Sequence, residues 1–284
     1  MNSTIELDQL RPFRLIDCKE WKIESPLLKY AFNVNSQFGE DGILERMFAI
    51  LQIPRGYCVE FGASDGKSLS NTYNLIQNHG WSGLLIEANI DLYRNLCETY
   101  QGNPNVKMLN CSVDIEGDRT IDSLLRMSKH QREVDLMSID IDGMDYFIFE
   151  SMSEFRPKVL VIEFNPSIPN DVVFIQAKNN KVHQGSSLAA MIELAKIKRY
   201  ELVCATATNA IFVCAELYLL FGLETNHIDK LYRPPMNGRI FHGYDSTIFI
   251  LGMPYLIWSG VQIEHSDIQA LPKSSRRYAG AQNS

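Results

Sequence analysis

The sequence of 284 residues lacks four features that often reveal a function or a location. Its six cysteines include no C-x-x-C pair and most lie in apolar runs, so we expect reduced, buried thiols rather than a zinc site or a disulfide framework. Positive charge is scarce, and a formal net charge of −7 argues against general binding to nucleic acid or to membrane surfaces. The most apolar run, residues 210–223, is too short to span a bilayer. The N-terminus has no basic region followed by an apolar block, so no signal peptide is predicted and a soluble, cytoplasmic protein is expected.

The apolar residues that are present, 45% of the chain, follow an alternation of strands and helices. Buried strands are predicted at residues 57–63, 83–89, 106–113, 135–142, 158–165, 201–206 and 209–216, with helical segments between most of them. These helical segments include residues 68–80 and residues 91–100, the latter with Asp91 as its N-cap. Short apolar strands separated by helices are typical of a parallel sheet covered on both faces. The link ATATN before the last strand is too short for a crossover, so this strand is expected to run antiparallel.

Three segments follow from this pattern. Residues 1–55 are predicted to form an N-terminal helical segment, because EDGILERMFAILQI places its apolar residues on one helical face. Residues 56–221 form the α/β core, and residues 222–284 hold many aromatic residues and histidines outside the alternation. We interpret this last segment as a substrate cap or an oligomer contact followed by a polar tail, with ordinary core packing as the alternative for its aromatic residues.

Carboxylates follow nearly every predicted strand. In an open parallel sheet, ligands bind beyond the carboxyl ends of the strands, so the residues there are the first candidates for a site. They are Glu60, Gly62, Ala63, Asp65 and Gly66 after the first strand, Glu87, Ala88 and Asn89 after the second, Ser112 and Asp114 after the third, Asp140 and Asp142 after the fourth, and Glu163 and Asn165 after the fifth.

The turn after the first strand contains Gly62 and Gly66, which allow a sharp backbone turn and the close approach of a ligand. Their spacing is G-x-x-x-G rather than the dinucleotide pattern G-x-G-x-x-G, and Glu60 and Asp65 would repel a pyrophosphate. Glu87 is well placed to accept both hydroxyls of a ribose. A ligand with a ribose and a positive charge but no phosphate is S-adenosylmethionine, although the glycines taken alone also fit an ordinary strand-to-helix turn.

Several motifs carry a family resemblance across residues 36–215. The segments SQFGEDGILE, VEFGASDG, LLIEAN, DLMSIDIDGMDYFIFESM, PKVLVIEFNPSIP and QGSSLAAMIELAKIKRYELV resemble the FkbM-type group of class I S-adenosylmethionine-dependent methyltransferases. The resemblance implies an α/β fold of the Rossmann-like seven-stranded class, mostly parallel with an antiparallel last strand, plus helical N-terminal and C-terminal cap segments. It also implies methyl transfer, commonly to a hydroxyl oxygen of a sugar, glycan or natural product. Glu60, Phe61 and Ser64 replace residues of the more familiar pattern VD-x-GAN-x-G, which marks a subgroup.

Carried over residue by residue, the resemblance implies a cofactor site. Ser70 and Asn71, in the first turn of the helix after the glycines, would reach the carboxylate or amino group of the cofactor. Glu87 would hold the ribose. The other implied contacts are Glu60, Gly62, Ala63, Asp65, Gly66 and Asp140 around the methionine and adenosine, Ala88 and Asn89 near the adenine, and Ser112 and Asp114 along the adenine pocket.

The motif SIDIDG places Asp140 and Asp142 one residue apart, with both side chains on one side of the chain. Two like charges so close resist joint ionisation unless a cation or a donor relieves them. One hypothesis is a divalent cation such as Mg²⁺, with Glu163 or Asn165 completing an oxygen shell. The alternative is that Asp140 contacts the cofactor and Asp142 caps the helix that follows.

A hydroxyl acceptor requires a general base, because alcohols are weak nucleophiles near neutral pH. His183 is the first candidate, since histidine changes charge close to neutral pH and can accept a proton. It is equally compatible with a metal ligand or an exposed loop histidine. His242 and Tyr244, in the aromatic segment, are second choices.

Two other classes of function remain open for this sequence. A dinucleotide-dependent oxidoreductase would also use Glu87, but the G-x-x-x-G turn weighs against it. A catalytically silent Rossmann-like binding module would have no need for the clustered carboxylates Asp140, Asp142 and Glu163. The identity of the acceptor, the methylated atom and the oligomeric state, including a homo-oligomer, are left undecided.

Overall fold

The structure is a computed structural model that describes residues 25–128, 133–232, 239–251, 255–256 and 261–277. Its chain divides into two compact units, of which the larger is Ile23–Pro234 and the other includes Pro235–Ser284. Cys18, one of the six cysteines considered above, lies outside the described residues. The other five are free thiols, and Cys58, Cys204 and Cys214 among them are buried.

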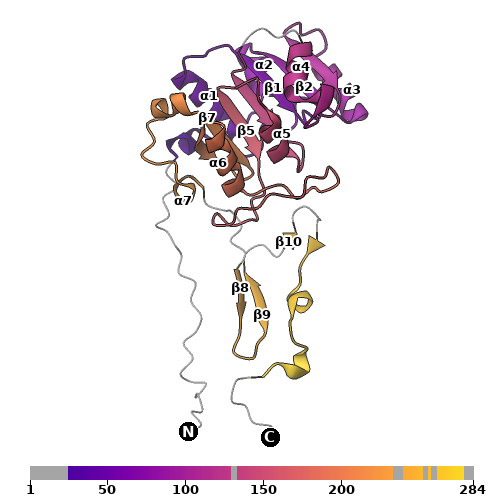
Figure 1. The fold of residues 1–284 in the computed structure, drawn as a ribbon, viewed down its shortest axis with the longest axis vertical. Coiled ribbons are helices and arrows are strands. Elements are labelled where there is room, and N and C mark those ends of the chain that lie inside the picture. Colours follow the sequence, from indigo (N-terminus) through magenta and orange to yellow (C-terminus); the bar gives the residue numbers. More distant parts are fainter. Residues whose placement is uncertain (1–24, 129–132, 233–238, 252–254, 257–260, 278–284) are drawn as a thin grey trace. The chain divides into compact units, whose positions relative to one another are not determined.

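A seven-stranded sheet forms the centre of the larger unit (Figure 1). Its strands are β1 (Tyr57–Phe61), β2 (Ser82–Glu87), β3 (Val106–Asn110), β4 (Leu136–Ile139), β5 (Val159–Glu163), β6 (Tyr200–Ala205) and β7 (Asn209–Cys214). The order across the sheet is β3-β2-β1-β4-β5-β7-β6, and β7 runs antiparallel to both of its neighbours while the other pairings are parallel. The predicted fold class, with its antiparallel last strand, is confirmed.

Helices cover both faces of this sheet. They are α1 (Glu40–Ile50), α2 (Tyr73–His79), α3 (Ile90–Thr99), α4 (Ile121–Met127), α5 (Asp145–Ser151), α6 (Leu188–Ile197) and α7 (Ile228–Leu231). Apolar residues of α1, α2 and α3 belong to one buried cluster with Cys58 of β1, whereas those of α4, α5 and α6 belong to another with Val59. Because successive strand residues point to opposite faces, both faces of β1 are buried, and this explains why the strands read as continuous apolar runs.

Two helix starts differ from the sequence prediction. The helix expected from about residue 68 begins only at Tyr73, because the chain between Gly62 and Thr72 is irregular and takes left-handed backbone angles at Ser64 and Leu69 as well as at glycines. The N-cap of α3 is Asn89, not Asp91: the Asn89 side chain accepts from the amides of Asp91 and Leu92.

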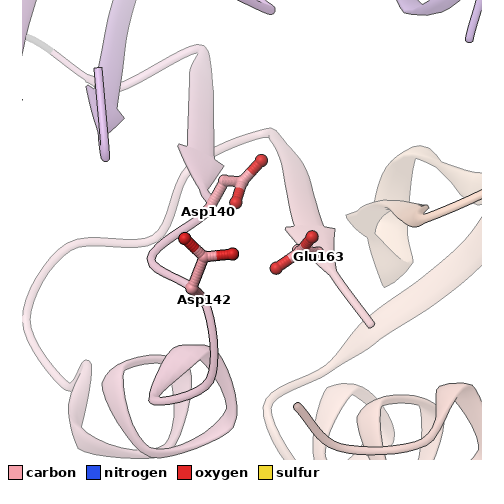
Figure 2. Close-up of side chains that lie close together, drawn as sticks. All are labelled: Asp140, Asp142 and Glu163. Carbon is pink, nitrogen blue, oxygen red and sulfur yellow. The ribbon is translucent and has the colours of Figure 1, made fainter. Parts of the chain in front are cut away.

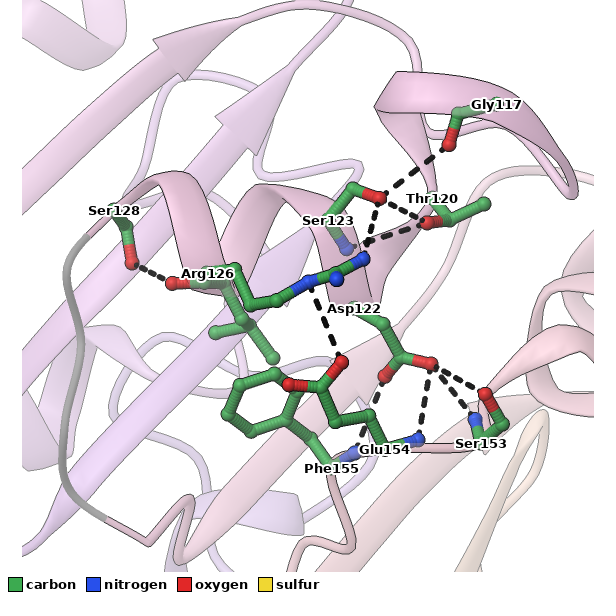
Figure 3. A network of polar contacts seen from close by, with 10 residues as sticks. Gly117, Thr120, Asp122, Ser123, Arg126, Ser128, Ser153, Glu154 and Phe155 are labelled. Atoms are coloured by element: carbon green, nitrogen blue, oxygen red, sulfur yellow. Dashed lines mark hydrogen bonds and ion pairs between the residues drawn. The ribbon is translucent and has the colours of Figure 1, made fainter.

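One buried carboxylate ties α4 to the segment that follows α5 (Figure 3). Asp122, in the first turn of α4, accepts hydrogen bonds from the amides of Ser153, Glu154 and Phe155 and from the Ser153 hydroxyl, at 2.8–3.2 Å. Arg126 adds an ion pair to Glu154 at 3.3 Å. These bonds satisfy the backbone donors of residues 153–155, so they fix the connection from α5 to β5.

The C-terminal residues contain hairpins that the sequence did not predict, alongside short 3₁₀ turns. Strands β8 (Arg239–His242) and β9 (Ile248–Leu251) pair antiparallel, as do β10 (Tyr255–Leu256) and β11 (Val261–Gln262). Phe241 and Phe249 stack with ring centroids 5.2 Å apart. Among the residues that the structure describes, no helix has the length and apolar character needed to cross a membrane.

Candidate functional site

A cavity of about 580 Å³ lies at the carboxyl ends of the central strands, where the polar residues were predicted to converge. Eleven of the predicted site residues line it: Glu60, Gly62, Ala63, Ser70, Asn71, Glu87, Ala88, Ser112, Asp140, Asp142 and Glu163. Strands β1, β2 and β5 and the loops after β3 and β4 each contribute, so the parallel register of these strands brings the residues to one edge.

Close contacts require glycine at two positions of the turn after β1. Gly62 has a φ of +73°, and a Cβ atom placed on it would lie 1.6 Å from the carbonyl oxygen of Asp140. Gly66 has a φ of +74° and faces α3 instead, where an added Cβ would lie 2.3 Å from Leu96. The Tyr100 hydroxyl donates to the Gly66 carbonyl at 3.0 Å. Gly62 therefore shapes the cavity wall, and Gly66 packs the turn onto α3.

Glu60 holds the loop between this turn and α2. Its buried carboxylate accepts from the Ser70 hydroxyl at 2.7 Å, from the Thr72 hydroxyl at 2.6 Å and from the Asn71 amide at 2.9 Å. Burial raises the pKa of Glu60 above its usual value, while these donors lower it in part. Ser70 and Asn71 were predicted in the first turn of a helix, but they lie before α2 and are positioned by Glu60.

Asn71 lines the cavity and has an unpaired side-chain acceptor. Its Nδ2 donates to the Ser138 hydroxyl at 3.0 Å, whereas its Oδ1 is buried without a hydrogen-bond partner among the described residues. The side chain is only 4% exposed, so the unpaired oxygen is costly unless a ligand donates to it.

Glu87, at the end of β2, is fixed on the other side of the cavity. Its Oε2 accepts from the Ser64 amide at 2.8 Å, and its Oε1 accepts from the Asn89 amide at 2.7 Å. A carboxylate oxygen can accept more than one hydrogen bond, so both oxygens keep the capacity to receive a donor from a ligand. The two backbone amides therefore hold Glu87 without consuming its capacity to bind.

Four of the six predicted site residues that do not line this cavity contribute to the fold instead. The Asp65 carboxylate accepts from the Lys67 and Ser68 amides within its own turn, and Gly66 packs on α3. The Asn89 side chain caps α3 rather than facing a ligand. Asn165 accepts from the amide and hydroxyl of Ser167 and donates to the Gln184 carbonyl. The prediction of Asn165 as a metal ligand is therefore not supported, since its amide oxygen already accepts two hydrogen bonds.

Asp140, Asp142 and Glu163 bring their carboxylates together, with ligand oxygens within 4.8 Å of one another (Figure 2). Burial, and then repulsion from the neighbouring carboxylates, raises the pKa of Asp140 and of Glu163. Asp142 is exposed and has a φ of +55°. It does not cap α5, whose N-cap position is Met144, so that alternative interpretation of Asp142 is wrong.

Asp145 was not singled out as a site residue, yet it shapes this turn. Its buried carboxylate accepts from the Ile141 amide at 2.9 Å and from the Gly143 amide at 2.8 Å. These bonds bracket Asp142 and stabilise its left-handed backbone conformation. The motif spacing D-x-D-G-x-D was visible in the sequence, but nothing in it separated a turn-forming aspartate from the exposed one.

A second cavity, of about 780 Å³, shares Ala88, Ser112, Val113, Ile141 and Asp142 with the first. Asp114 lines it and forms an ion pair with Arg119 at 2.7 Å. His183 lines it too, with its Nδ1 2.9 Å from the carbonyl oxygen of Asp142. The first-choice base thus lies beside the carboxylate trio, in a space that continues from the first cavity.

Other predicted and unpredicted residues fall as follows. His242 and Tyr244 belong to the second compact unit, on and after β8, and both are exposed. The sequence prediction missed Gln37, Leu92 and Cys111, which also line the first cavity. Gln37 lies in the segment SQFGEDGILE, whose resemblance to the family was the available signal. Leu92 and Cys111 gave none, because an apolar helix residue and a thiol after a strand are ordinary core residues.

The sheet order, the reversed β7 and a cavity at the carboxyl ends of the central strands define the Rossmann-like fold of class I methyltransferases. Within that class, residues 114–201 match the family model of the methyltransferase FkbM domain. The match includes β4, β5, the carboxylate trio and His183. It confirms the resemblance to FkbM-type methyltransferases for the motifs within that range. It supports an S-adenosylmethionine-dependent methyltransferase.

Solved structures of methyltransferases are similar to part of the chain. The N-terminal domain of EvdMO1, determined in the presence of S-adenosylhomocysteine and D-fucose, has 12% identity and a TM-score of 0.41, with 70% of this chain and 97% of that chain covered. The CurJ carbon methyltransferase has 11% identity and a TM-score of 0.39, covering 62% of this chain and 53% of that one. An O-methyltransferase family protein from Burkholderia thailandensis has 8% identity and a TM-score of 0.38, covering 61% and 57%. The alignments to the last two thus span less than two thirds of their length. No match was found among curated proteins.

Proposed function

We propose that this protein is an S-adenosylmethionine-dependent methyltransferase that methylates a hydroxyl group of a small molecule or glycan, with a divalent cation at the carboxylate trio. The observation that carries the proposal is a pair of acceptor side chains that line one cavity. The Glu87 carboxylate on β2 can accept further hydrogen bonds, and the Asn71 Oδ1 before α2 has no partner among the described residues. They suit a ligand with hydroxyl donors at one end and an ammonium group at the other.

The charge of the first cavity favours this cofactor over a dinucleotide. Five carboxyl groups line it, those of Glu60, Glu87, Asp140, Asp142 and Glu163, and no lysine or arginine of the described residues does, so the lining has no cation to neutralise a pyrophosphate. A ribose would donate to Glu87, and an ammonium group would donate to Asn71 Oδ1, which relieves the buried unpaired oxygen. When bound, S-adenosylmethionine supplies an electrophilic methyl group. The backbone contact at Gly62 and the buried Asn71 would fix the position of the cofactor.

The acceptor is proposed to bind in the second cavity, because that space meets the first one at Asp142 and Ile141. His183 would take the proton of the acceptor hydroxyl. Asp140, Asp142 and Glu163 would hold a divalent cation, for which oxygen ligands are typical. Such an ion increases the acidity of a coordinated hydroxyl. Its charge would also remove the repulsion among the three carboxylates.

Calorimetric titration with S-adenosylhomocysteine and, separately, with NAD tests the cofactor. We expect S-adenosylhomocysteine to bind with a Kd on the order of micromolar and NAD to give no heat of binding. Binding of NAD alone would move the protein to the oxidoreductase class. Binding of the adenosyl compound without turnover of any hydroxyl acceptor in a broad panel would favour the silent binding module.

Two cysteines allow a second test of whether S-adenosylhomocysteine binds in the first cavity. Cys111 lines the first cavity and is partly buried, while Cys97 on α3 is also partly buried but does not line it. S-adenosylhomocysteine should slow alkylation of Cys111 by iodoacetamide and leave Cys97 unchanged, as measured by peptide mass spectrometry. Equal protection of both thiols would indicate general stabilisation rather than binding in this cavity.

Asp142→Asn tests the cation, because it removes one charge from the trio without changing the shape of the side chain. We expect the affinity for Mn²⁺, followed by calorimetry, to fall about tenfold or more, since a charged ligand is worth roughly 1.5–3 kcal/mol. The affinity for S-adenosylhomocysteine should stay within about twofold of the wild-type value.

The matched control is Glu116→Gln, a charge removal at an exposed residue that lines the second cavity away from the trio. It should leave Mn²⁺ binding unchanged. If Asp142→Asn instead weakens S-adenosylhomocysteine and spares Mn²⁺, the carboxylate contacts the cofactor directly and the cation proposal fails.

A further inference from the structure

The middle of the loop between β5 and α6 contains one buried side chain, while the residues around it are exposed or half-buried. Between residues 167 and 185, no residue belongs to a helix or strand, and Gln176 alone is buried, at 2% exposure. Neighbouring apolar residues such as Val173 and Ile175 are exposed instead. A loop of this length without secondary structure is unusual in a compact domain and is commonly functional. Burying an amide in its middle requires compensating hydrogen bonds.

Gln176 makes those bonds with the segment that carries His183. Its Oε1 accepts from the Gln184 amide at 3.2 Å and from the Gly185 amide at 2.9 Å, and its Nε2 donates to the Val182 carbonyl at 3.0 Å. The backbone amide of Gln176 also donates to the Ser186 hydroxyl at 3.3 Å. The Gln176 side chain thus pairs with backbone groups on both sides of His183, as the backbone of a neighbouring strand would.

The same side chain packs against the turn after β4. A Cβ atom on Gly143 would lie 2.6 Å from the Val182 carbonyl oxygen and 2.9 Å from Gln176 Oε1, so only glycine permits this close approach. Gln176 Nε2 also lies 3.9 Å from the Met144 sulfur. The loop and the carboxylate-bearing turn are therefore held against each other at Gly143, one residue after Asp142.

The contact between His183 and the Asp142 carbonyl oxygen determines the tautomer of His183. A backbone carbonyl can only accept, so the 2.9 Å contact with Asp142 requires His183 Nδ1 to carry the hydrogen. In the neutral imidazole the other nitrogen, Nε2, is then the acceptor. That tautomer is the one able to take a proton through Nε2.

We propose that Gln176 is a positioning residue that locks the 182–185 segment to the turn after β4 and thereby holds His183 in the Nδ1-protonated tautomer. The role of His183 as base rests on the proposed function, whereas the positioning itself does not. Without the side-chain amide of Gln176, the backbone groups of Val182, Gln184 and Gly185 would lose their hydrogen-bond partners. The segment would then move, and His183 would lose its contact with the Asp142 carbonyl.

Long-range ¹H–¹⁵N spectra of the imidazoles test the proposal, recorded at a pH where histidine is neutral. The His183 signal is identified by its loss in His183→Ala. We expect the Nδ1-protonated pattern in the wild type and a mixture of tautomers in Gln176→Ala. The matched control is Gln184→Ala, the same substitution in the same loop at an exposed side chain, and it should retain the wild-type pattern. An unchanged tautomer in Gln176→Ala would overturn the proposal.

Amide hydrogen exchange in the wild type gives a second test that does not depend on the variant folding. The Gln184 and Gly185 amides should exchange about tenfold or more slowly than the His183 amide, because only the first two donate to Gln176. Equal exchange at the three positions would contradict the proposal. Binding of S-adenosylhomocysteine, measured in parallel, judges the proposed function separately, since neither the tautomer nor the exchange rates require the cofactor.

Discussion

Gly62→Ala should destabilise the protein by about 4 kcal/mol or more, a loss that few single substitutions reach. The added Cβ would lie 1.6 Å from the carbonyl oxygen of Asp140, so β1 and β4 would have to separate where their ends meet. Alanine at a φ of +73° adds conformational strain of roughly 1–2 kcal/mol. Chemical denaturation gives the free energy of unfolding, and calorimetry on whatever folds should find no binding of S-adenosylhomocysteine.

Gly102→Ala isolates the backbone strain from the steric clash. Gly102 has a φ of +79°, close to that of Gly62, but a Cβ atom there would meet nothing within 4 Å. This variant should cost only about 1–2 kcal/mol and bind S-adenosylhomocysteine normally. Equal losses for the two variants would mean that the contact between Gly62 and Asp140 is relaxed in solution.

Glu87→Ala should weaken S-adenosylhomocysteine about tenfold or more, through the loss of charge-assisted hydrogen bonds worth roughly 1.5–3 kcal/mol. The loss should depend on the ribose, because Glu87 is proposed to accept from its hydroxyls. Measuring the variant and the wild type with S-adenosylhomocysteine and with its 2′-deoxy analogue completes a thermodynamic cycle. We expect the analogue to bind more weakly than the parent compound to the wild type and equally well to Glu87→Ala.

Glu98→Ala is the matched control for this cycle. Glu98 is exposed on α3, away from the cavity lining, so both ligands should bind this variant as they bind the wild type. If the 2′-deoxy penalty is the same in Glu87→Ala as in the wild type, Glu87 does not contact the ribose. Its loss of affinity would then come from the Ser64 and Asn89 amides that it holds.

The site divides its carboxylates between two tasks. Glu60 and Asp145 are buried and accept from backbone or hydroxyl groups of their own loops, so they build the turns after β1 and β4. Glu87 and Asp142 keep acceptor capacity toward the cavities. Residues of the same type at neighbouring positions can thus differ in role: Asp145 shapes the turn, whereas Asp142 keeps acceptor capacity toward the cavities.

The strands of the sheet and the edge at which the polar residues meet could be predicted from the sequence alone. Each strand is a short apolar run, and the polar residues that follow come to one edge because parallel strands end on the same side. The reversed β7 followed from the short link ATATN, and the trio of Asp140, Asp142 and Glu163 followed from the strand ends. These features depend on local periodicity and on connection length, which a single sequence contains.

The role of each polar residue could not be predicted from the sequence, because it depends on the tertiary structure. Asn89 caps α3 and Asn165 braces a loop, although both were predicted to bind a ligand. His183 reaches Asp142 across 41 residues, through a loop that Gln176 organises. Such hydrogen bonds form between segments without regular structure, and no periodicity specifies which donor meets which acceptor. The positions of these residues therefore emerge only once the helices and strands have packed.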